Sequence, residues 1–194
     1  MDNRSALLSH ALRLFAARGY DAVGVQEIVD AAGVTKPTLY HYFGSKRGLL
    51  EALLEERAAP LQAAVREAVV YPADVTLTLR NVVRAYLTYG RAEPTFCRLL
   101  WSMRFAPPDS EPYRAAVKLH QEQLELLQQL FRQAAEHHGN LAGREQAYAI
   151  TLLATIHAYL EAAALDVPQP GPVTALDEEL VYRVVQQFMH GIFA

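Results

Sequence analysis

The 194-residue sequence predicts an all-α protein, and three observations support this fold class. Apolar residues recur three or four positions apart along most of the chain, which is the spacing of one helix face. We find no convincing run of alternating apolar and polar residues bounded by turns, the pattern of a half-buried strand. Pro and Gly clusters interrupt the helical pattern at intervals typical of helix connections. We therefore expect about nine helices.

The first three predicted helices are short and closely spaced. Residues 5–18 carry an apolar stripe and end before Gly19, and residues 25–32 form a second helix that ends at Gly33. A third helix should begin at residue 36, with Thr35 as its N-cap. Pro37 fits its first turn, because the N–H groups there have no partner within the helix.

Six further helices should follow. Residues 46–70 form the fourth, which we expect Pro60 to kink or split. The simplest division is a three-helix head, residues 1–48, and a helical body, residues 49–194. The remaining helices are expected at 74–91, 93–105, 112–138, 144–166 and 175–193.

Composition restricts the class of protein further. Hydrophobic residues make up 52% of the chain and charged residues 20%, which supports a sizeable core. The single cysteine, Cys97, cannot form an internal disulfide, and this fits a reducing compartment. The N-terminus lacks the apolar core of a signal peptide, so we expect a cytoplasmic protein. The apolar run 147–165 contains Thr, His and Glu residues, so we expect a helix buried on nearly all sides rather than a membrane span.

The net charge of −3 is distributed unevenly. Residues 1–48 contain six Lys or Arg and four Asp or Glu, a balance of +2, so the rest of the chain carries −5. A basic head on an acidic body would permit a polyanionic partner at the head only.

Residues 25–43 have the pattern of a helix-turn-helix, in which the second helix enters the DNA major groove. Leu39 and Phe43 are four residues apart and should face inward, which leaves Lys36, Thr38, Tyr40 and His41 outward, with Tyr42 at the boundary. Tyr hydroxyl, imidazole and ammonium groups can contact phosphates or base edges. The alternative is that both tyrosines pack against neighbouring helices and His41 is merely solvated.

The Gly19-Tyr20 pair, the stretch VQEIVDAAGVTKPTLYHYFGSK and residues 48–53 resemble the DNA-binding domain of TetR-type (TetR/AcrR) transcriptional repressors. The resemblance covers residues 5–54. It implies a homodimer that binds a palindromic operator and is released by a small effector bound in the body. Where this family usually has Thr or Ser, the chain has Val23-Gly24, so we expect no side-chain contact there. The resemblance assigns DNA contacts to Gln26, Lys36, Pro37, Thr38, Tyr40, His41, Tyr42 and Lys46.

The resemblance also implies that the last two helices pair with their copies in a four-helix dimer interface. Packing within one chain is the alternative. The predicted interface residues are Tyr148, Leu152, Tyr159, Val181, Val184, Val185, Phe188 and Ile192.

The middle of the chain is rich in aromatic residues and Met, which suit an adaptable apolar ligand site but also an ordinary core. His157 and Glu161 lie four apart, so they could bind a polar ligand group or satisfy each other. The candidate pocket residues are Tyr86, Tyr89, Phe96, Leu100, Trp101, Met103, Phe105, Tyr113, His120, His157 and Glu161.

No Gly-rich phosphate loop, nucleophile elbow or metal-ligand spacing is apparent in the sequence. We therefore predict no catalytic residues, metal or cofactor. The predicted function is a ligand-responsive repressor that binds an operator and responds to a largely apolar or aromatic effector. The alternative is a small-molecule-binding or protein-interaction module that keeps the helix-turn-helix shape without binding DNA.

Overall fold

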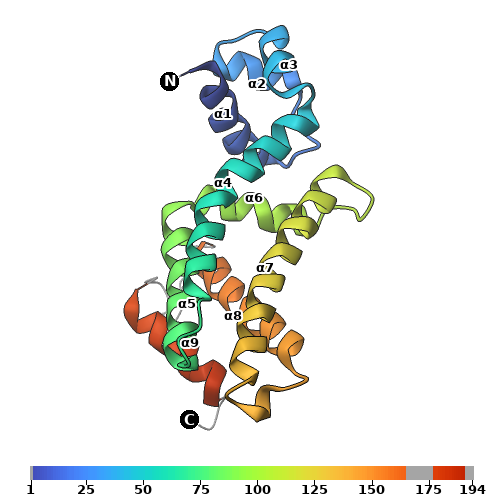
Figure 1. Ribbon diagram of the computed structural model, residues 1–194. Helices are drawn as coiled ribbons and strands as arrows, with labels where there is room; N and C mark the ends of the chain where they lie inside the picture. The colour runs from blue at the N-terminus through green and yellow to red at the C-terminus, as the bar shows by residue number, and fades with distance from the viewer. Residues whose placement is uncertain (1, 165–176, 191–194) are drawn as a thin grey trace. The chain divides into compact units, whose positions relative to one another are not determined.

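The computed structural model describes residues 2–164 and 177–190. These residues form nine α-helices and one short 3₁₀ helix and contain no strand, which confirms the all-α prediction (Figure 1). The chain folds into two compact units. Unit 1 comprises Met1–Pro60 and Pro94–Leu119, and unit 2 comprises Leu61–Glu93 and His120–Ala194. The two units are defined by compactness, whereas the boundary predicted after residue 48 separates a DNA-binding domain from the body. That boundary stays a prediction.

Unit 1 contains a three-helix head, and its first helix, α1 (Asn3–Arg18), packs against α2 (Val25–Ala32), α3 (Lys36–Phe43) and α6 (Pro94–Arg104). Phe15, Leu39 and Phe96 are fully buried in unit 1. Because α6 belongs to this unit, a segment from the middle of the chain supports the head. The helices of unit 1 are α1 (Asn3–Arg18), α2 (Val25–Ala32), α3 (Lys36–Phe43), the first part of α4 (Lys46–Ala68), α6 (Pro94–Arg104) and the first part of α7 (Glu111–Ala135).

The helix ends of the head follow the residues that the sequence places there, with one difference. Gly33 adopts the left-handed conformation that ends α2, with φ of 66°. Gly24 precedes α2 and provides no side-chain hydrogen bond. The predicted cap Thr35 has the extended backbone of an N-cap, but its hydroxyl pairs with the Thr38 hydroxyl instead of a backbone N–H.

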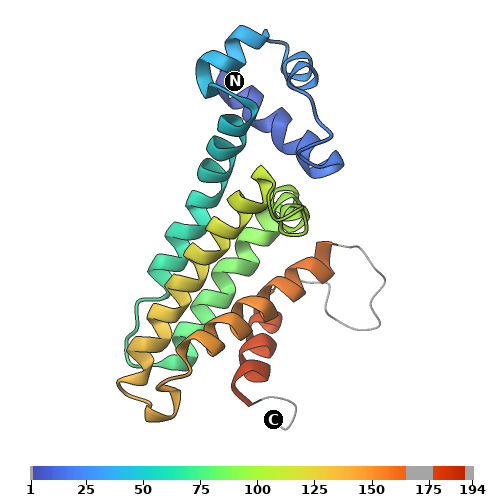
Figure 2. The same cartoon turned by 90° about the vertical axis from the view of Figure 1, so that its right-hand side faces the viewer.

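Unit 2 is built around α5 (Val75–Ala92), which packs against α8 (Glu145–Ala164) and α9 (Glu178–His190) (Figure 2). Gly90 permits a close approach between α5 and α8, because a Cβ there would lie 2.3 Å from Leu160 Cδ2. Arg84 on α5 donates two hydrogen bonds, of 2.6 and 2.8 Å, to the carboxylate of Glu178 on α9. The helices introduced here are α5 (Val75–Ala92), α8 (Glu145–Ala164) and α9 (Glu178–His190), with the 3₁₀ helix at Gly139–Leu141.

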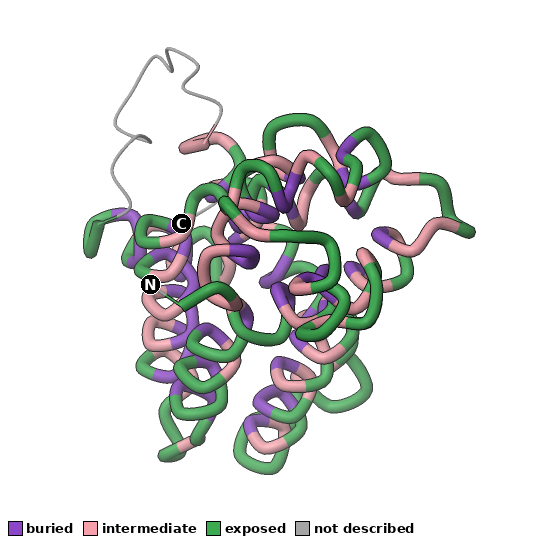
Figure 3. Tube along the Cα trace, turned by 90° about the horizontal axis from the view of Figure 1, so that it is seen from above, coloured by how far each residue is buried: buried purple, intermediate pink, exposed green. Residues whose placement is uncertain are grey.

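One expectation about an individual helix is narrowed and another is corrected. The sequence predicts that Pro60 kinks or splits α4, and the helix continues through Pro60 without a split. Helix α8 is not buried on nearly all sides, because the face that carries Ala147, Thr151, Ala154 and Ala158 is exposed. Figure 3 shows how buried, intermediate and exposed residues alternate along the described chain. Among the described helices, α8 is the one whose length and composition would suit a membrane span, and 28% of its apolar window is buried.

Candidate DNA-binding site and ligand-binding core

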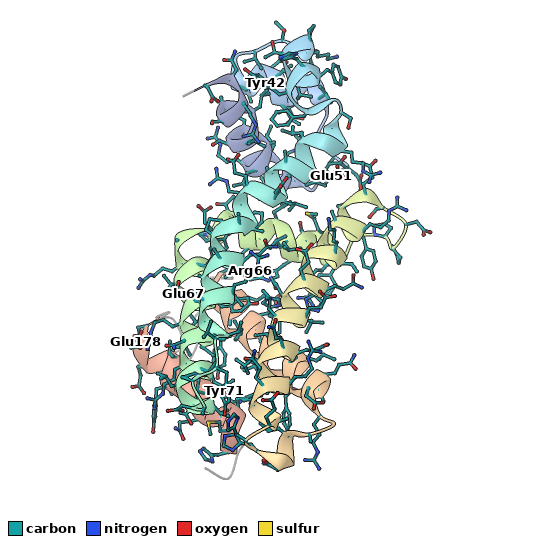
Figure 4. All side chains as sticks on the ribbon, in the orientation of Figure 1. Tyr42, Glu51, Arg66, Glu67, Tyr71 and Glu178 are labelled. Carbon is teal, nitrogen blue, oxygen red and sulfur yellow. The ribbon has the colours of Figure 1, made fainter. Side chains whose placement is uncertain are left out.

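Helix α3 presents a mixed polar and aromatic surface to solvent. Leu39 is fully buried and Phe43 is half-buried, so the inward pair is as predicted. Tyr40 is 46% exposed and Tyr42 is 43% exposed, which contradicts the alternative that both rings pack into the fold. Figure 4 labels Tyr42 on the head. We call the exposed set the α3 face. It consists of Lys36, Pro37, Tyr40, His41 and Tyr42.

The polar groups of the α3 face differ in how far they are already bonded. Lys36 forms no ion pair with any residue that the structure describes, so its charge is available to an anion. The rings of His41 and Tyr42 meet edge-on, with their centroids 5.5 Å apart. Thr38 is half-buried, and its hydroxyl lies 2.9 Å from that of Thr35.

Other polar groups of the head are engaged within the protein. Gln26 Nε2, a predicted DNA contact on α2, donates to Asp30 Oδ1 at 2.7 Å. Three arginines of the head form ion pairs with glutamates, and these are the pairs Arg4–Glu56, Arg18–Glu27 and Arg47–Glu51. Lys36 differs from these three arginines because it has no acidic partner among the residues that the structure describes.

Lys46, the predicted phosphate anchor, has an environment that the sequence did not reveal. Its ammonium nitrogen lies 4.1 Å from the centroid of the Tyr20 ring and 5.9 Å from that of Phe15. Burial lowers the pKa of Lys46, against the opposing charges of Asp21 and Glu111. Tyr20 in turn donates a 2.6 Å hydrogen bond to Glu111 Oε2. Sequence reasoning missed this bond because 91 positions separate the two residues.

The predicted pocket residues do not form one group. Phe96 and Met103 are buried in unit 1, but Phe105, which follows α6, is 84% exposed. Phe105 therefore lies on the surface, because α6 ends at Arg104 and Phe105 is not part of its buried face. Glu161 is also exposed. Unit 1 contains Phe96, Leu100, Trp101, Met103, Phe105 and Tyr113, whereas unit 2 contains Tyr86, Tyr89, His120, His157 and Glu161.

Unit 2 brings together three of these residues from three helices. The Tyr86 ring lies edge-on to His157, with centroids 6.2 Å apart, and the His157 ring lies 6.1 Å from His120. Tyr86 is only 1% exposed, and its hydroxyl has no hydrogen-bond partner among the described residues. Burial raises the pKa of Tyr86, so the hydroxyl remains protonated and can donate to a ligand acceptor.

We predict that Tyr86→Phe raises the melting temperature by about 2–4 °C, because it removes a buried hydroxyl that costs about 1 kcal/mol. Thermal unfolding monitored by circular dichroism measures the change. The control is Tyr159→Phe, since the Tyr159 hydroxyl donates to Gln187 Oε1 at 2.8 Å and its loss should not stabilise the protein. A lower melting temperature for Tyr86→Phe would contradict the prediction.

Many of the predicted dimer residues are used inside the protomer. Four of them are at most 3% exposed within the protomer, and these are Leu152, Val181, Val184 and Val185. Helical spacing identifies their apolar face, but it does not show whether that face packs within the protomer or against a second copy. Phe188 and Tyr148 pack with Phe131 in an aromatic cluster, with centroid separations of 5.6–6.2 Å. Tyr148, Tyr159 and Phe188 are half-buried, and Ile192 lies outside the described residues.

The exposed surface of α8 and α9 consists of different residues. Ile150 on α8 is 47% exposed, and Tyr182 and Met189 on α9 are 48% and 40% exposed. Ala154 and Ala158 are also exposed on α8. No three His, Cys, Asp or Glu side chains come together as a metal site in the described parts of either unit.

A helix-turn-helix with an exposed, cationic second helix on an all-α fold defines a class of DNA-binding regulators. Residues 7–53 match the model of the family described as bacterial regulatory proteins, tetR family. Residues 7–53 therefore belong to the TetR family of transcriptional regulators.

Two curated relatives support this membership. The HTH-type transcriptional activator FasR of Mycolicibacterium smegmatis is 36% identical over 115 residues, which cover 59% of this chain and 51% of FasR. The HTH-type transcriptional repressor KstR2 of Rhodococcus jostii is 39% identical over 80 residues, covering 41% of this chain and 39% of KstR2. The chain thus matches about half or less of the length of these relatives.

Solved structures extend the likeness of fold to nearly the whole chain. FadR of Bacillus subtilis, solved in complex with stearoyl-CoA, superposes with a TM-score of 0.79 at 17% identity and covers 97% of this chain and 98% of its own. The TetR-family regulator SCO4454 of Streptomyces coelicolor gives a TM-score of 0.69 at 26% identity, covering 98% of this chain and 92% of its own.

Proposed function

We propose that the protein is a cytoplasmic repressor that binds a palindromic operator as a homodimer and is released by a small, largely apolar effector. The observation that carries this proposal is the α3 face, where an unpaired Lys36 ammonium stands beside exposed Tyr40, His41 and Tyr42. A soluble protein gains no packing energy from exposed rings, whereas DNA offers them phosphates and base edges.

The α3 face provides both parts of a DNA contact. Lys36 neutralises a phosphate and releases its counterions, which gives affinity that depends on salt. The hydroxyls of Tyr40 and Tyr42 and the imidazole of His41 can form hydrogen bonds with base edges or phosphates. We propose that Pro37, Thr38 and Gln26 complete the contact surface, with Gln26 exchanging its Asp30 partner for DNA.

The proposed dimer uses the exposed faces of α8 and α9. Ala147, Thr151, Ala154 and Ala158 form a stripe of small residues on α8, and such a stripe allows two helices to approach closely. Tyr182 and Met189 add exposed apolar area on α9. Two copies joined here would carry two heads, as a palindromic operator requires.

We predict that Ala154→Arg weakens self-association at least tenfold, because the interface would have to bury an unpaired guanidinium. Sedimentation equilibrium at several protein concentrations measures the dissociation constant. Ala63→Arg, an exposed position on α4, is the control for the added charge and should leave the constant unchanged. If Ala154→Arg dimerises as strongly as the wild type, α8 does not form the interface.

The effector is proposed to bind to unit 2. There the Tyr86 hydroxyl can donate a hydrogen bond to a polar group on an otherwise apolar molecule. Stearoyl-CoA, the molecule with which FadR of Bacillus subtilis was solved, is a suitable first probe. Addition of an effector should release DNA and leave the effector chemically unchanged, which separates a regulator from an enzyme.

Fluorescence anisotropy with the intergenic DNA beside the protein's own gene tests the proposed function. We expect binding that prefers this duplex over a scrambled one and weakens steeply between two salt concentrations. Equal binding to both duplexes would contradict operator recognition at this site. An interaction that is nearly independent of salt, or no binding, would favour the interaction-module alternative.

A further inference from the structure

We infer that Tyr20 and Glu111 position the Lys46 ammonium for contact with a DNA phosphate, so that the first turn of α7 controls one contact of the DNA-binding head. The inference rests on the proposed DNA-binding function. It adds two positioning residues, neither of which belongs to the helix-turn-helix, and one of which lies in the middle of the chain. All three residues lie in unit 1.

Tyr20 is held firmly between two parts of unit 1. Its side chain is only 6% exposed, and its ring lies 5.1 Å from that of the fully buried Phe15 on α1. Its hydroxyl donates to Glu111 Oε2 at 2.6 Å. A hydrogen bond to an ionised carboxylate is stronger than one between neutral groups, so Glu111 fixes the orientation of the ring.

The fixed ring determines where Lys46 can lie. Lys46 is the first residue of α4 and follows Gly44 and Ser45, which separate α3 from α4. Its ammonium nitrogen lies 4.1 Å from the Tyr20 centroid, within the range of a cation–π interaction. The ring faces one side of an ammonium that has three N–H donors, which leaves donors for a phosphate.

Prior placement of Lys46 favours DNA binding for an entropic reason. A free lysine side chain loses rotamer freedom when it is immobilised on a phosphate. Here the cation–π contact restricts Lys46 when the protein folds, so less freedom is lost on binding. If Glu111 moves away, Tyr20 loses its anchor and Lys46 loses its restriction. A movement of the first turn of α7 would therefore change the affinity of the protein for DNA.

The test is the salt dependence of DNA binding, which a merely structural role would not change. Each phosphate contact contributes about 0.9 to the slope of log affinity against log salt concentration. Because the proposed dimer places two copies of Lys46 on one operator, we expect Lys46→Ala to reduce this slope by about 1.8. Tyr20→Leu should reduce it by less, and the double variant should reduce it no further than Lys46→Ala. Tyr20→Phe keeps the ring but loses the bond to Glu111, so it should weaken binding about three- to tenfold.

Two controls accompany these variants. Glu125→Gln makes a carboxylate-to-amide change at an exposed position of α7 and should bind DNA as the wild type does. Glu111→Gln should instead weaken binding in the same direction as Tyr20→Phe, although removing a negative charge alone would strengthen it. Circular dichroism verifies the fold, and if Tyr20→Leu does not fold, Tyr20→Phe and Glu111→Gln decide.

The outcomes separate this inference from the function on which it rests. If the wild type binds no DNA at any salt concentration, the proposed function fails and the inference fails with it. If the wild type binds but Lys46→Ala leaves the slope unchanged, Lys46 contacts no phosphate. If Lys46→Ala reduces the slope and Tyr20→Leu does not, or Tyr20→Phe and Glu111→Gln bind as tightly as the wild type, positioning is overturned while the regulator remains.

Discussion

A Gly48→Ala variant should lose about 3 kcal/mol of unfolding free energy, near the upper end of ordinary single substitutions. Gly48 lies in the first turn of α4, and a Cβ there would come within 2.0 Å of the Phe43 carbonyl oxygen. The Gly48 N–H also donates to Ser45 Oγ at 2.9 Å, which keeps α4 close to the end of α3. Alanine usually stabilises a helix relative to glycine, so a large loss would identify the steric clash as the cause.

Thermal unfolding should show the Gly48→Ala melting temperature lowered by about 6–12 °C. Operator binding should weaken with it, because the clash displaces α3 relative to α4. Gly139→Ala is the matched control, since a Cβ at Gly139 meets nothing within 4 Å, and its stability should stay within about 0.5 kcal/mol of the wild type. Equal melting temperatures for the two variants would show that the α3–α4 turn adjusts freely.

Lys36→Ala should weaken operator binding at least about tenfold and reduce the salt slope by about 1.8, because each of the two heads of the proposed dimer loses one phosphate contact. Lys36 is exposed and forms no ion pair with the residues that the structure describes, so the melting temperature should not change. Fluorescence anisotropy at four or more salt concentrations measures both the affinity and the slope.

Lys118→Ala is the control for Lys36→Ala. Lys118 is an exposed lysine on α7, so its replacement makes the same change in net charge away from the α3 face. If both variants lose the same affinity, the effect is one of net charge and α3 does not face the DNA. If only Lys36→Ala loses affinity, the α3 face contains a specific contact.

Local sequence signals predicted much of the head. Gly33 ends α2 in the left-handed conformation that glycine adopts readily, and Pro37 lies in the first turn of α3. The four-residue spacing of Leu39 and Phe43 identified the inward side of α3 and hence its exposed side. These predictions succeeded because capping, turns and helix faces depend on residues within about one helical turn.

Predictions about the apolar helices of unit 2 were weaker. Helix α8 is apolar on several faces, and its sequence could not show which face the protomer buries. The structure buries Leu152 within the protomer and leaves Ile150 exposed, so the candidate interface shifts to residues that the sequence analysis did not select. Helical spacing identifies residues that share a face, but the partner of that face is a property of the whole fold.

The sequence by itself determined the helices, their ends and the outward residues of α3, since each depends on interactions between near neighbours in the chain. The tertiary structure decided that α6 supports α1, that Glu111 reaches Tyr20, and that His157 meets both Tyr86 and His120. These contacts join residues tens of positions apart, and no local periodicity encodes them. They arise because each helix must bury an apolar face against another, and the choice of partner is made by the packing of the whole unit.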